Sequence, residues 1–158
     1  NLDVMRVCFE PSAYNDPQGS RQNIVFQPPE AVQESLAALD EWALQQAAAN
    51  SLQWFGKARS AESLAESYTP CSKKTDRYPA SFRAKMNAAP PAAVRVWNKE
   101  REFCEMPSSL QGWFVAPRIV LRSVWFMPGG QFGLVLEVTD LLLFEHEATM
   151  RAQVACPF

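Results

Sequence analysis

The chain has 158 residues, the length of one domain, or of one domain with an appendage, that buries a real hydrophobic core. It has no run of about eighteen apolar residues that could span a bilayer, and its first residues lack the charged and apolar regions of a signal peptide, so we expect an intracellular protein that does not enter a membrane. The formal net charge of −2 excludes a uniformly basic protein, but it hides a segregation of charge along the sequence.

The first predicted elements are two paired strands. Val4–Phe9 is rich in apolar and β-branched residues, and Ile24–Phe26 is a second short apolar run. Pro11–Gln22 lies between them and is rich in the residues that favour turns. We therefore predict a strand pair within residues 4–26, joined by a flexible loop.

An amphipathic helix is predicted over residues 30–49. Its apolar residues recur every three or four positions, and its acidic residues fall mostly elsewhere on the cylinder. Pro29 stands just before or at the first turn, where its missing N–H does no harm. The apolar stripe is suited to covering the end or the side of a barrel, and binding a partner protein is the alternative. The stripe consists of Val32, Leu36, Leu39, Ala43 and Ala47.

A short helix and a basic loop follow. Ser60 is placed as the N-cap of a helix over residues 60–66. The chain then enters Cys71–Arg77, a polar loop that contains Lys73 and Lys74. A basic loop at the edge of a barrel is well placed to contact phosphates, although most such loops only face water.

The central stretch, residues 78–144, predicts a small β-barrel with a basic, aromatic face. Every second residue of Ser81–Asn87 is apolar, and the residues between them include Arg83 and Lys85. Because successive side chains of a strand point to opposite faces, one face suits a core and the other a polyanion. The same alternation recurs in two further segments, Val94–Trp97 and Arg118–Phe126.

Charge is segregated between this stretch and the rest of the chain. Cys71–Arg122 contains ten basic and four acidic residues, whereas the remainder contains five basic and thirteen acidic ones. A basic middle with acidic flanks suits a protein that binds an anion on one face and repels it elsewhere. An ordinary solvated surface whose charges happen to cluster is the alternative.

The last segments complete the predicted barrel. Asn98–Glu102 is predicted as a charged hairpin tip, and the two glycines of Pro128–Gln131 indicate a hairpin turn before a final strand over Phe132–Phe144. Residues 148–158 show no strong period and are predicted as a loose tail. The single domain is therefore expected to cover residues 1–147.

No catalytic motif is present in the sequence. Pro128–Gly133 lacks the lysine of a phosphate loop, and there is no Gly-x-Ser-x-Gly elbow. Asp140 interrupts an apolar strand, where facing solvent or pairing with an arginine on the next strand explains it better than a catalytic role. We therefore predict a protein that is not an enzyme and needs no cofactor.

The cysteines and the single histidine do not suggest a metal site. Cys8, Cys71, Cys104 and Cys156 are widely spaced, so reduced thiols are expected, with a pair of structural disulfides as the alternative. His146 lies between two glutamates without a second ligand nearby, and we expect a solvated surface residue rather than a base or a ligand.

Binding of single-stranded nucleic acid fits these features better. Proteins that hold single strands combine a positive groove with aromatic rings on which bases stack, at about 1 to 3 kcal/mol per base. Trp97, Trp113 and Trp125 each lie within a few residues of a basic side chain and are the stacking candidates. A core position is the alternative for each, and Trp54 and Phe55 are expected in the core.

Short segments spread over residues 52–144 carry a resemblance to a known family. They are, in order, Trp54–Lys57, Ser60–Glu62, Tyr68–Pro70, Tyr78–Lys85, Val124–Phe126 and Phe132–Gly133. Together they resemble the OB-fold single-stranded DNA-binding proteins of large eukaryotic DNA viruses, which are similar in organisation to phage replication proteins of that fold. The resemblance implies an OB barrel that binds single-stranded DNA in replication, recombination or repair, without sequence preference or cofactor. It also implies backbone contacts from Arg83 and Lys85.

These inferences combine into one prediction. We expect a mostly β, α+β protein with an OB-like five-stranded antiparallel β-barrel and one amphipathic capping helix, which binds single-stranded DNA through a basic aromatic groove. The predicted nucleic-acid-binding residues are Lys73, Lys74, Arg83, Lys85, Arg95, Trp97, Arg118, Arg122 and Trp125. Replication proteins and a second copy of the chain are further expected partners, and the nucleus or a viral replication site is the expected location. The alternative is an accessory subunit of a larger assembly that uses the same Trp and Arg surface as a protein interface.

Overall fold

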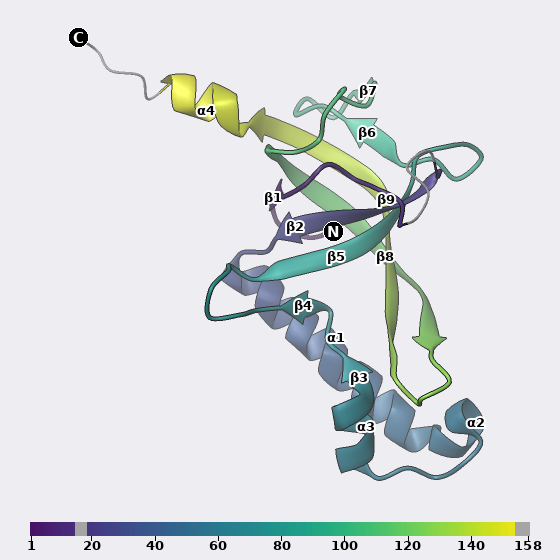
Figure 1. Ribbon diagram of the computed structural model, residues 1–158. Helices are drawn as coiled ribbons and strands as arrows, with labels where there is room; N and C mark the ends of the chain where they lie inside the picture. Colours follow the sequence, from purple (N-terminus) through teal and green to yellow (C-terminus); the bar gives the residue numbers. More distant parts are fainter. Residues whose placement is uncertain (15–18, 154–158) are drawn as a thin grey trace.

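Five strands close into a barrel (Figure 1). The structure is a computed structural model that describes residues 1–14 and 19–153. The barrel strands are β1 (Met5–Val7), β2 (Arg21–Gln27), β5 (Ser81–Asn87), β8 (Trp113–Phe126) and β9 (Phe132–His146).

The order of these strands around the ring identifies the fold. β1 pairs with β2, β2 with β5, β5 with β9, β9 with β8, and β8 with β1. All of these pairings are antiparallel except that of β5 with β9, which is parallel. A small Greek-key barrel of this kind is an OB fold. The predicted fold class is therefore confirmed, with one parallel pairing in place of a fully antiparallel ring.

Alternating side chains explain why β5 closes over a core. Phe82, Ala84 and Met86 are buried, whereas Arg83 is exposed. Phe26 on β2 stacks on Phe82 with the ring centroids 5.8 Å apart. The period-two pattern of the sequence therefore assigned the two faces of this strand correctly.

The long strands β8 and β9 extend beyond the barrel as a hairpin (Figure 1). Their register shifts at three places, between Phe114 and Val115, between Arg118 and Ile119, and between Leu121 and Ser123. Such bulges bend a strand and increase its twist. β8 can therefore line the barrel with its first half and project away with its second. The predicted Gly-Gly turn connects the two strands, and Gly130 has the positive φ of 89° that such a turn favours.

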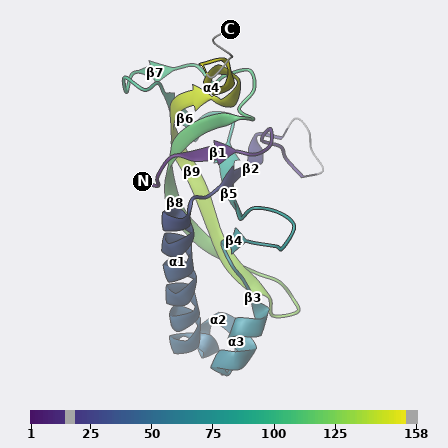
Figure 2. The same cartoon turned by 90° about the vertical axis from the view of Figure 1, so that its left-hand side faces the viewer.

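Helix α1 (Glu30–Ala49) has the bounds that the sequence predicts and connects two hydrophobic cores. Val32 and Leu36 near its start pack into the barrel core, whereas Ala43 and Ala47 near its end pack into a smaller core. Figure 2 shows α1 running lengthwise from the barrel to two short helices at its far end. α1 therefore covers the barrel, as expected, and also extends the molecule beyond it.

The smaller core lies between these short helices and the tip of the β8–β9 hairpin. The helices are α2 (Ser51–Phe55), which the sequence did not predict, and α3 (Ala61–Ser67). The side chain of Ser60 accepts a hydrogen bond from the backbone N–H of Ser63, which confirms the predicted N-cap of α3. Trp54 and Phe55 are half-buried at the edge of this core, in partial agreement with the expectation of core positions.

Four short strands complete the sheet. β3 (Tyr68–Thr69) and β6 (Arg95–Trp97) pair in parallel with β9, and β4 (Ser72–Lys73) pairs with β5. β7 (Phe103–Cys104) pairs with β6, so Asn98–Glu102 is the hairpin tip that the sequence predicts.

The predicted tail is helical where the structure describes it. Residues 147–153 form helix α4 (Glu147–Gln153) rather than a loose tail. Glu147 in the first turn and Arg151 in the last turn complement the helix dipole. Glu147 also accepts a hydrogen bond from Arg6 Nε at 3.0 Å, which ties the start of α4 to β1. Residues 154–158 of the predicted tail lie outside the described residues, and the domain boundary at residue 147 stays a prediction.

The described part of the chain contains no helix that is long and apolar enough to cross a membrane. Within the same residues there is no group of three or more His, Cys, Asp or Glu side chains placed to hold a metal ion. Cys8, Cys71 and Cys104 are free thiols, and Cys156 lies outside the described residues.

Candidate nucleic-acid interface

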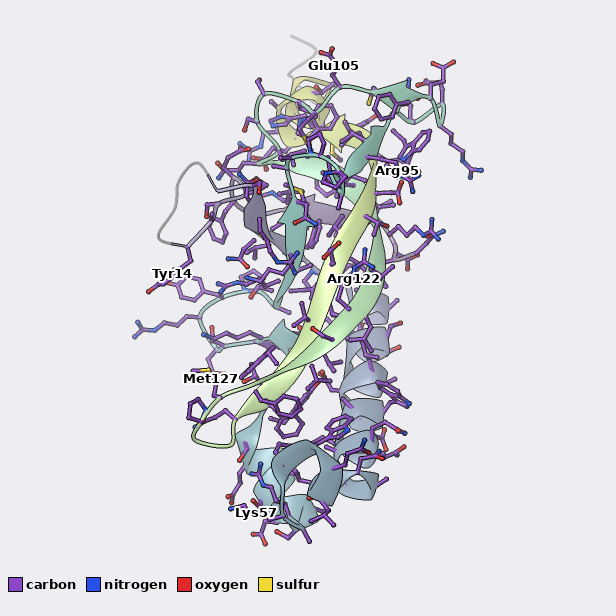
Figure 3. The ribbon with its side chains drawn as sticks, turned by 90° about the vertical axis from the view of Figure 1, so that its right-hand side faces the viewer. Tyr14, Lys57, Arg95, Glu105, Arg122 and Met127 are labelled. Carbon is purple, nitrogen blue, oxygen red and sulfur yellow. The ribbon has the colours of Figure 1, made fainter. Side chains whose placement is uncertain are left out.

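The outer face of β2 and β5 forms the floor of a groove. The β1–β2 loop contributes Tyr14 to its wall, and the β8–β9 hairpin contributes Met127 (Figure 3). Trp125 of the same hairpin also lines the groove. This part of the groove has a volume of about 640 Å³. It continues past Arg83 and Phe9 into two further hollows of about 340 and 690 Å³. We call this continuous surface the β2–β5 groove.

Aromatic side chains line the β2–β5 groove and are open to a ligand. Phe9, Tyr14 and Tyr78 are 63%, 87% and 71% exposed. Trp125 is half-buried because its indole covers Gly133, the residue opposite it on β9. The three nearest indole atoms lie 2.7 to 2.8 Å from the place that a Cβ of residue 133 would occupy, so this glycine is what lets the ring lie against the strand. The groove therefore offers rings from three separate segments of the chain.

Three basic residues line the same groove without a carboxylate partner. Within the described residues, Lys73, Arg83 and Lys85 have no carboxylate oxygen within 4.0 Å of their side-chain nitrogens. Burial, and then the positive charges of Arg21 and Arg83, lower the pKa of Lys85. Arg21 is itself paired with Glu137 at 3.1 Å, so an anion placed here would relieve the repulsion between Arg83 and Lys85.

Among the residues that the structure describes, one carboxylate, that of Glu10, also lines the groove, but its hydrogen bonds are directed elsewhere. It accepts hydrogen bonds from Ser109 Oγ at 2.6 Å and from the backbone N–H of Leu110 at 3.1 Å. Burial acts to raise the pKa of Glu10, but these hydrogen bonds outweigh it, and the pKa is lowered. Glu10 therefore holds the β7–β8 connection against the β1–β2 loop, and the groove keeps an excess of positive charge.

A second cluster of predicted residues surrounds Asp140 on β9, away from the groove. Arg95 Nε lies 2.8 Å from Asp140 Oδ1, and Trp97 Nε1 donates a hydrogen bond to the same oxygen at 3.0 Å. Arg118 Nη1 is 3.9 Å from Asp140 Oδ2. Burial acts to raise the pKa of Asp140, but the hydrogen bonds from Arg95 and Trp97 lower it overall. The expectation that Asp140 pairs with an arginine on a neighbouring strand is confirmed.

Arg122 belongs to a third cluster, around the buried Glu137. Arg122 Nη2 and Arg21 Nη1 each donate a hydrogen bond to this carboxylate at 3.1 Å, and Asn87 Nδ2 donates one at 3.4 Å. The four residues come from β8, β2, β5 and β9, so the cluster joins the strands at which the ring closes. In Figure 3, Arg95 and Arg122 lie apart from the side of the molecule that carries Tyr14 and Met127.

The structure thus divides eight of the nine predicted binding residues into two groups. Four of them line the β2–β5 groove: Lys73, Arg83, Lys85 and Trp125. Four others are held around the two carboxylates outside it: Arg95, Trp97, Arg118 and Arg122. Lys74 is exposed next to β4 and does not line the groove. That any of these residues binds nucleic acid stays a prediction.

Sequence reasoning missed the groove residues Phe9, Tyr14 and Tyr78. Phe9 and Tyr14 lie at the end of the first predicted strand and in a loop, where no periodic pattern marks a face. An aromatic residue among turn-forming residues was the available signal, because a ring in an exposed loop has no core to fill.

Other titratable groups in the described chain have structural contacts. His146 Nε2 is 2.9 Å from the backbone oxygen of Gln111, and its ring meets Trp113 edge to face. Tyr68 donates a hydrogen bond from its hydroxyl to Asp40 at 2.6 Å. Burial, followed by hydrogen bonding to Asp40, raises the pKa of the Cys71 thiol to about 12, so this thiol stays protonated near neutral pH.

Comparisons with known proteins add structural relatives only. No protein-family model matches the sequence, and the curated proteins contain no match. The single-stranded DNA-binding protein of bacteriophage Enc34, solved in complex with single-stranded DNA, matches with a TM-score of 0.56 at 14% identity, over 89% of this chain and 82% of that one. Its C-terminal truncation gives a TM-score of 0.55 at 14% identity, over 90% and 82% of the two chains.

A third solved structure has the same fold. It is gp2.5, a single-stranded DNA-binding protein encoded by bacteriophage T7, with a TM-score of 0.57 at 10% identity, over 92% of this chain and 90% of that one. At these identities the likeness establishes the fold, which extends over most of both chains.

Proposed function

We propose that this chain binds single-stranded DNA in the β2–β5 groove, without sequence preference and without chemical turnover. The observation that carries the proposal is that one continuous groove is lined by exposed aromatic rings and by cations that have no carboxylate partner among the described residues. In OB folds that bind oligonucleotides, the face of the second and third barrel strands and the loops beside it hold the ligand. β2 and β5 are the second and third barrel strands here. Solved structures that this chain resembles include those of two phage single-stranded DNA-binding proteins.

The cations act on the DNA backbone. Arg83 and Lys85 are two residues apart on β5 and therefore point to the same side, toward the groove. Lys73 on β4 lies farther along the same surface. Phosphates bound by these three side chains would release counterions from the strand, so affinity depends on salt and not on base identity.

The aromatic residues act on the bases. Tyr14 is supplied by the β1–β2 loop and Trp125 by the β8–β9 hairpin, at the wall of the hollow that Arg83 and Lys85 also line. Every base has a π-face, so stacking on these rings adds affinity and tolerates any sequence.

Titration with oligothymidine tests the proposal. Intrinsic tryptophan fluorescence is followed as a strand of about 20 to 30 nucleotides is added at about 50 and 200 mM salt, and quenching is expected because Trp125 lines the groove. With about −0.7 of salt slope per phosphate contact and three contacts, affinity should fall about 20-fold between the two salt concentrations. Equal affinity at both concentrations would contradict an electrostatic groove.

Absence of binding at either salt concentration would favour the accessory-subunit alternative, in which the same residues form a protein interface. We further propose that the protein acts in replication, recombination or repair, and that it contacts replication proteins or a second copy of itself. The proposed location is the nucleus or a viral replication site. The affiliation with proteins of large eukaryotic DNA viruses also stays a proposal, because the matches found are with phage proteins.

A further inference from the structure

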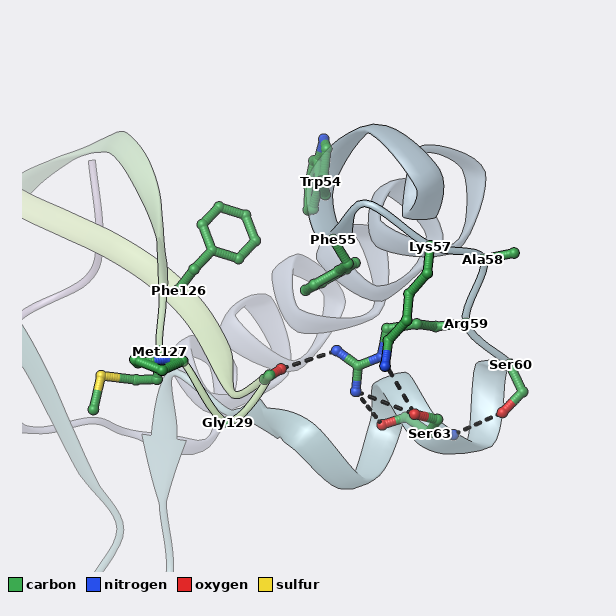
Figure 4. Close-up of a pocket in the computed structure, with 12 residues that line it drawn as sticks. Trp54, Phe55, Lys57, Ala58, Arg59, Ser60, Ser63, Phe126, Met127 and Gly129 are labelled. Atoms are coloured by element: carbon green, nitrogen blue, oxygen red, sulfur yellow. Dashed lines mark hydrogen bonds between the residues drawn. The ribbon is translucent and has the colours of Figure 1, made fainter.

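A second pocket adjoins the β2–β5 groove at the far end of the hairpin (Figure 4). It lies between the β8–β9 turn and the segment that joins α2 to α3, and its volume is about 720 Å³. This size is within the range of about 300 to 1,000 Å³ typical of pockets for small ligands. Phe126 and Met127 line both this pocket and the groove, so the two are continuous. We call it the hairpin pocket.

Three aromatic rings lie on one side of the hairpin pocket (Figure 4). Phe126 meets Phe55 and Trp54 edge to face, with ring centroids 5.5 and 6.1 Å apart. Phe126 is nevertheless 47% exposed, so part of its ring is free to pack against another flat ring. The rings therefore pack against one another on the inner side of the cluster, and the outer side of the cluster is open to solvent.

Among the described residues that line the hairpin pocket, Lys57 and Arg59 are basic and none is acidic. Arg59 donates hydrogen bonds to the backbone oxygen of Gly130 at 2.9 Å and to Ser67 Oγ at 2.7 Å. Both acceptors are neutral, so these hydrogen bonds position the hairpin turn without a carboxylate from the described part of the chain beside the guanidinium. Lys57 is exposed, and no carboxylate of the described residues lies within 4.0 Å of it.

We propose that a DNA strand held in the β2–β5 groove continues past Met127 into the hairpin pocket, where a base packs against Phe126 and Trp54 and Lys57 binds a backbone phosphate. This inference rests on the proposed function, because the strand reaches the pocket from the groove. The pocket combines the two features of the groove, exposed rings and basic residues, at the end of the β8–β9 hairpin that projects beyond the barrel and on the segment that joins α2 to α3. The binding site is then longer than the barrel face, and the added part should matter only for strands long enough to reach it.

A series of oligothymidines from about 4 to about 16 nucleotides tests this, because single OB folds cover site sizes in that range. Lys57→Glu should reduce affinity for the longest strands about tenfold and leave the shortest strands unaffected, because only the former place a phosphate at residue 57. Lys99→Glu is the matched control. It makes the same charge change at an exposed residue of the β6–β7 tip and should leave affinity unchanged at every length.

A conservative variant gives a second readout. Trp54→Phe keeps an aromatic ring in the cluster, so the protein should fold, and it should bind the shortest strands, which do not reach the hairpin pocket, like the wild type. It should lose the part of the fluorescence quenching that develops only with longer strands. Equal quenching by long strands in Trp54→Phe and the wild type would overturn the proposal.

The length series has two further decisive outcomes. One outcome is that the Lys57→Glu variant binds the longest strands as tightly as the wild type, or loses affinity equally at all strand lengths. Either result would overturn the extension into the hairpin pocket but would not contradict binding in the β2–β5 groove. If the wild type bound no strand of any length, the proposed function itself would fail.

Discussion

Arg83 and Arg95 show that the residue opposite an arginine on the neighbouring strand decides whether the arginine is paired with a carboxylate. Both alternate with apolar residues in their strands, and the sequence predicts the same role for them. Arg83 lies opposite Val25 on β2 and has no carboxylate partner among the described residues, whereas Arg95 lies opposite Asp140 and pairs with it. Periodicity along one strand identifies the outward face, but the register between strands selects the partner. This is why sequence reasoning could not separate groove cations from paired ones.

Removing either groove cation of β5 should weaken DNA binding in a salt-dependent way. Arg83→Ala and Lys85→Ala should each lower affinity about fivefold at about 0.1 M salt and reduce the salt slope by about 0.7, because each removes one phosphate contact. Affinity measured over a range of salt concentrations checks this. Lys99→Ala at the distant β6–β7 tip is the control and should keep both affinity and slope. A slope in Arg83→Ala as steep as that of the wild type would mean that Arg83 contacts no phosphate.

At the scale of the element, length decided what the sequence revealed. Helix α1 has 20 residues, enough for several repeats of its apolar stripe, and Pro29 marks its start. Helix α2 has 5 residues and α4 has 7, too few for a helical period to stand out, whereas α3, also 7 residues long, was predicted because Ser60 marks its start. Gly56, with a φ of 72°, ends α2 in the left-handed conformation that glycine favours, and it was the one local signal of that helix.

The β8–β9 hairpin depends on the absence of a side chain at Gly133. Gly133→Ala should displace the Trp125 indole, because the new Cβ would fall 2.7 Å from its nitrogen, and overpacking of this kind costs about 1 to 3 kcal/mol of unfolding free energy. Urea unfolding measures the loss, and the tryptophan emission should shift as the indole moves. Gly129→Ala in the same hairpin is the control, because its Cβ would meet only the flexible end of Gln131. If both variants were equally stable, Trp125 would not lie against Gly133.

At the scale of the whole molecule, charges that are separated in the sequence are brought together by the fold. Glu137 and Asp140 come from the acidic part of the chain and lie among arginines, most of them from the basic part. Within the part of the chain that the structure describes, the groove cations left without a carboxylate partner are Lys73, Arg83 and Lys85. The excess of basic residues over 71–122 was therefore a sound indication of a basic face, but it overstated how many cations are available.

The free energy of unfolding should depend on pH, because two buried carboxylates are ionised in the folded protein. Burial acts to raise the pKa values of Glu137 and Asp140, but hydrogen bonds from arginines outweigh it and hold both below their ordinary values of 4.5 and 3.8. The unfolded chain therefore binds these protons at higher pH than the folded one. The stabilisation by these groups is complete above about pH 5 and is lost as pH falls through the folded-state pKa values.

Unfolding by urea at a series of pH values from about 7 to 3 measures this dependence. The free energy of unfolding should decrease below about pH 5 in the wild type, and Glu137→Gln should be less stable at neutral pH but lose less stability on acidification. Identical pH profiles for the two proteins would show that Glu137 is not held in its ionised form by Arg21 and Arg122.

Strand β9 has a consequence for the order in which the protein can form. It pairs with β3, β5, β6 and β8, and every one of these partners precedes it in the sequence. During synthesis the partners leave the ribosome before the strand that joins them. The ring therefore cannot close on a nascent chain until Phe132–His146 has emerged. Until then, the earlier strands lack one of their hydrogen-bonding partners, and their apolar faces are not yet enclosed in a complete barrel.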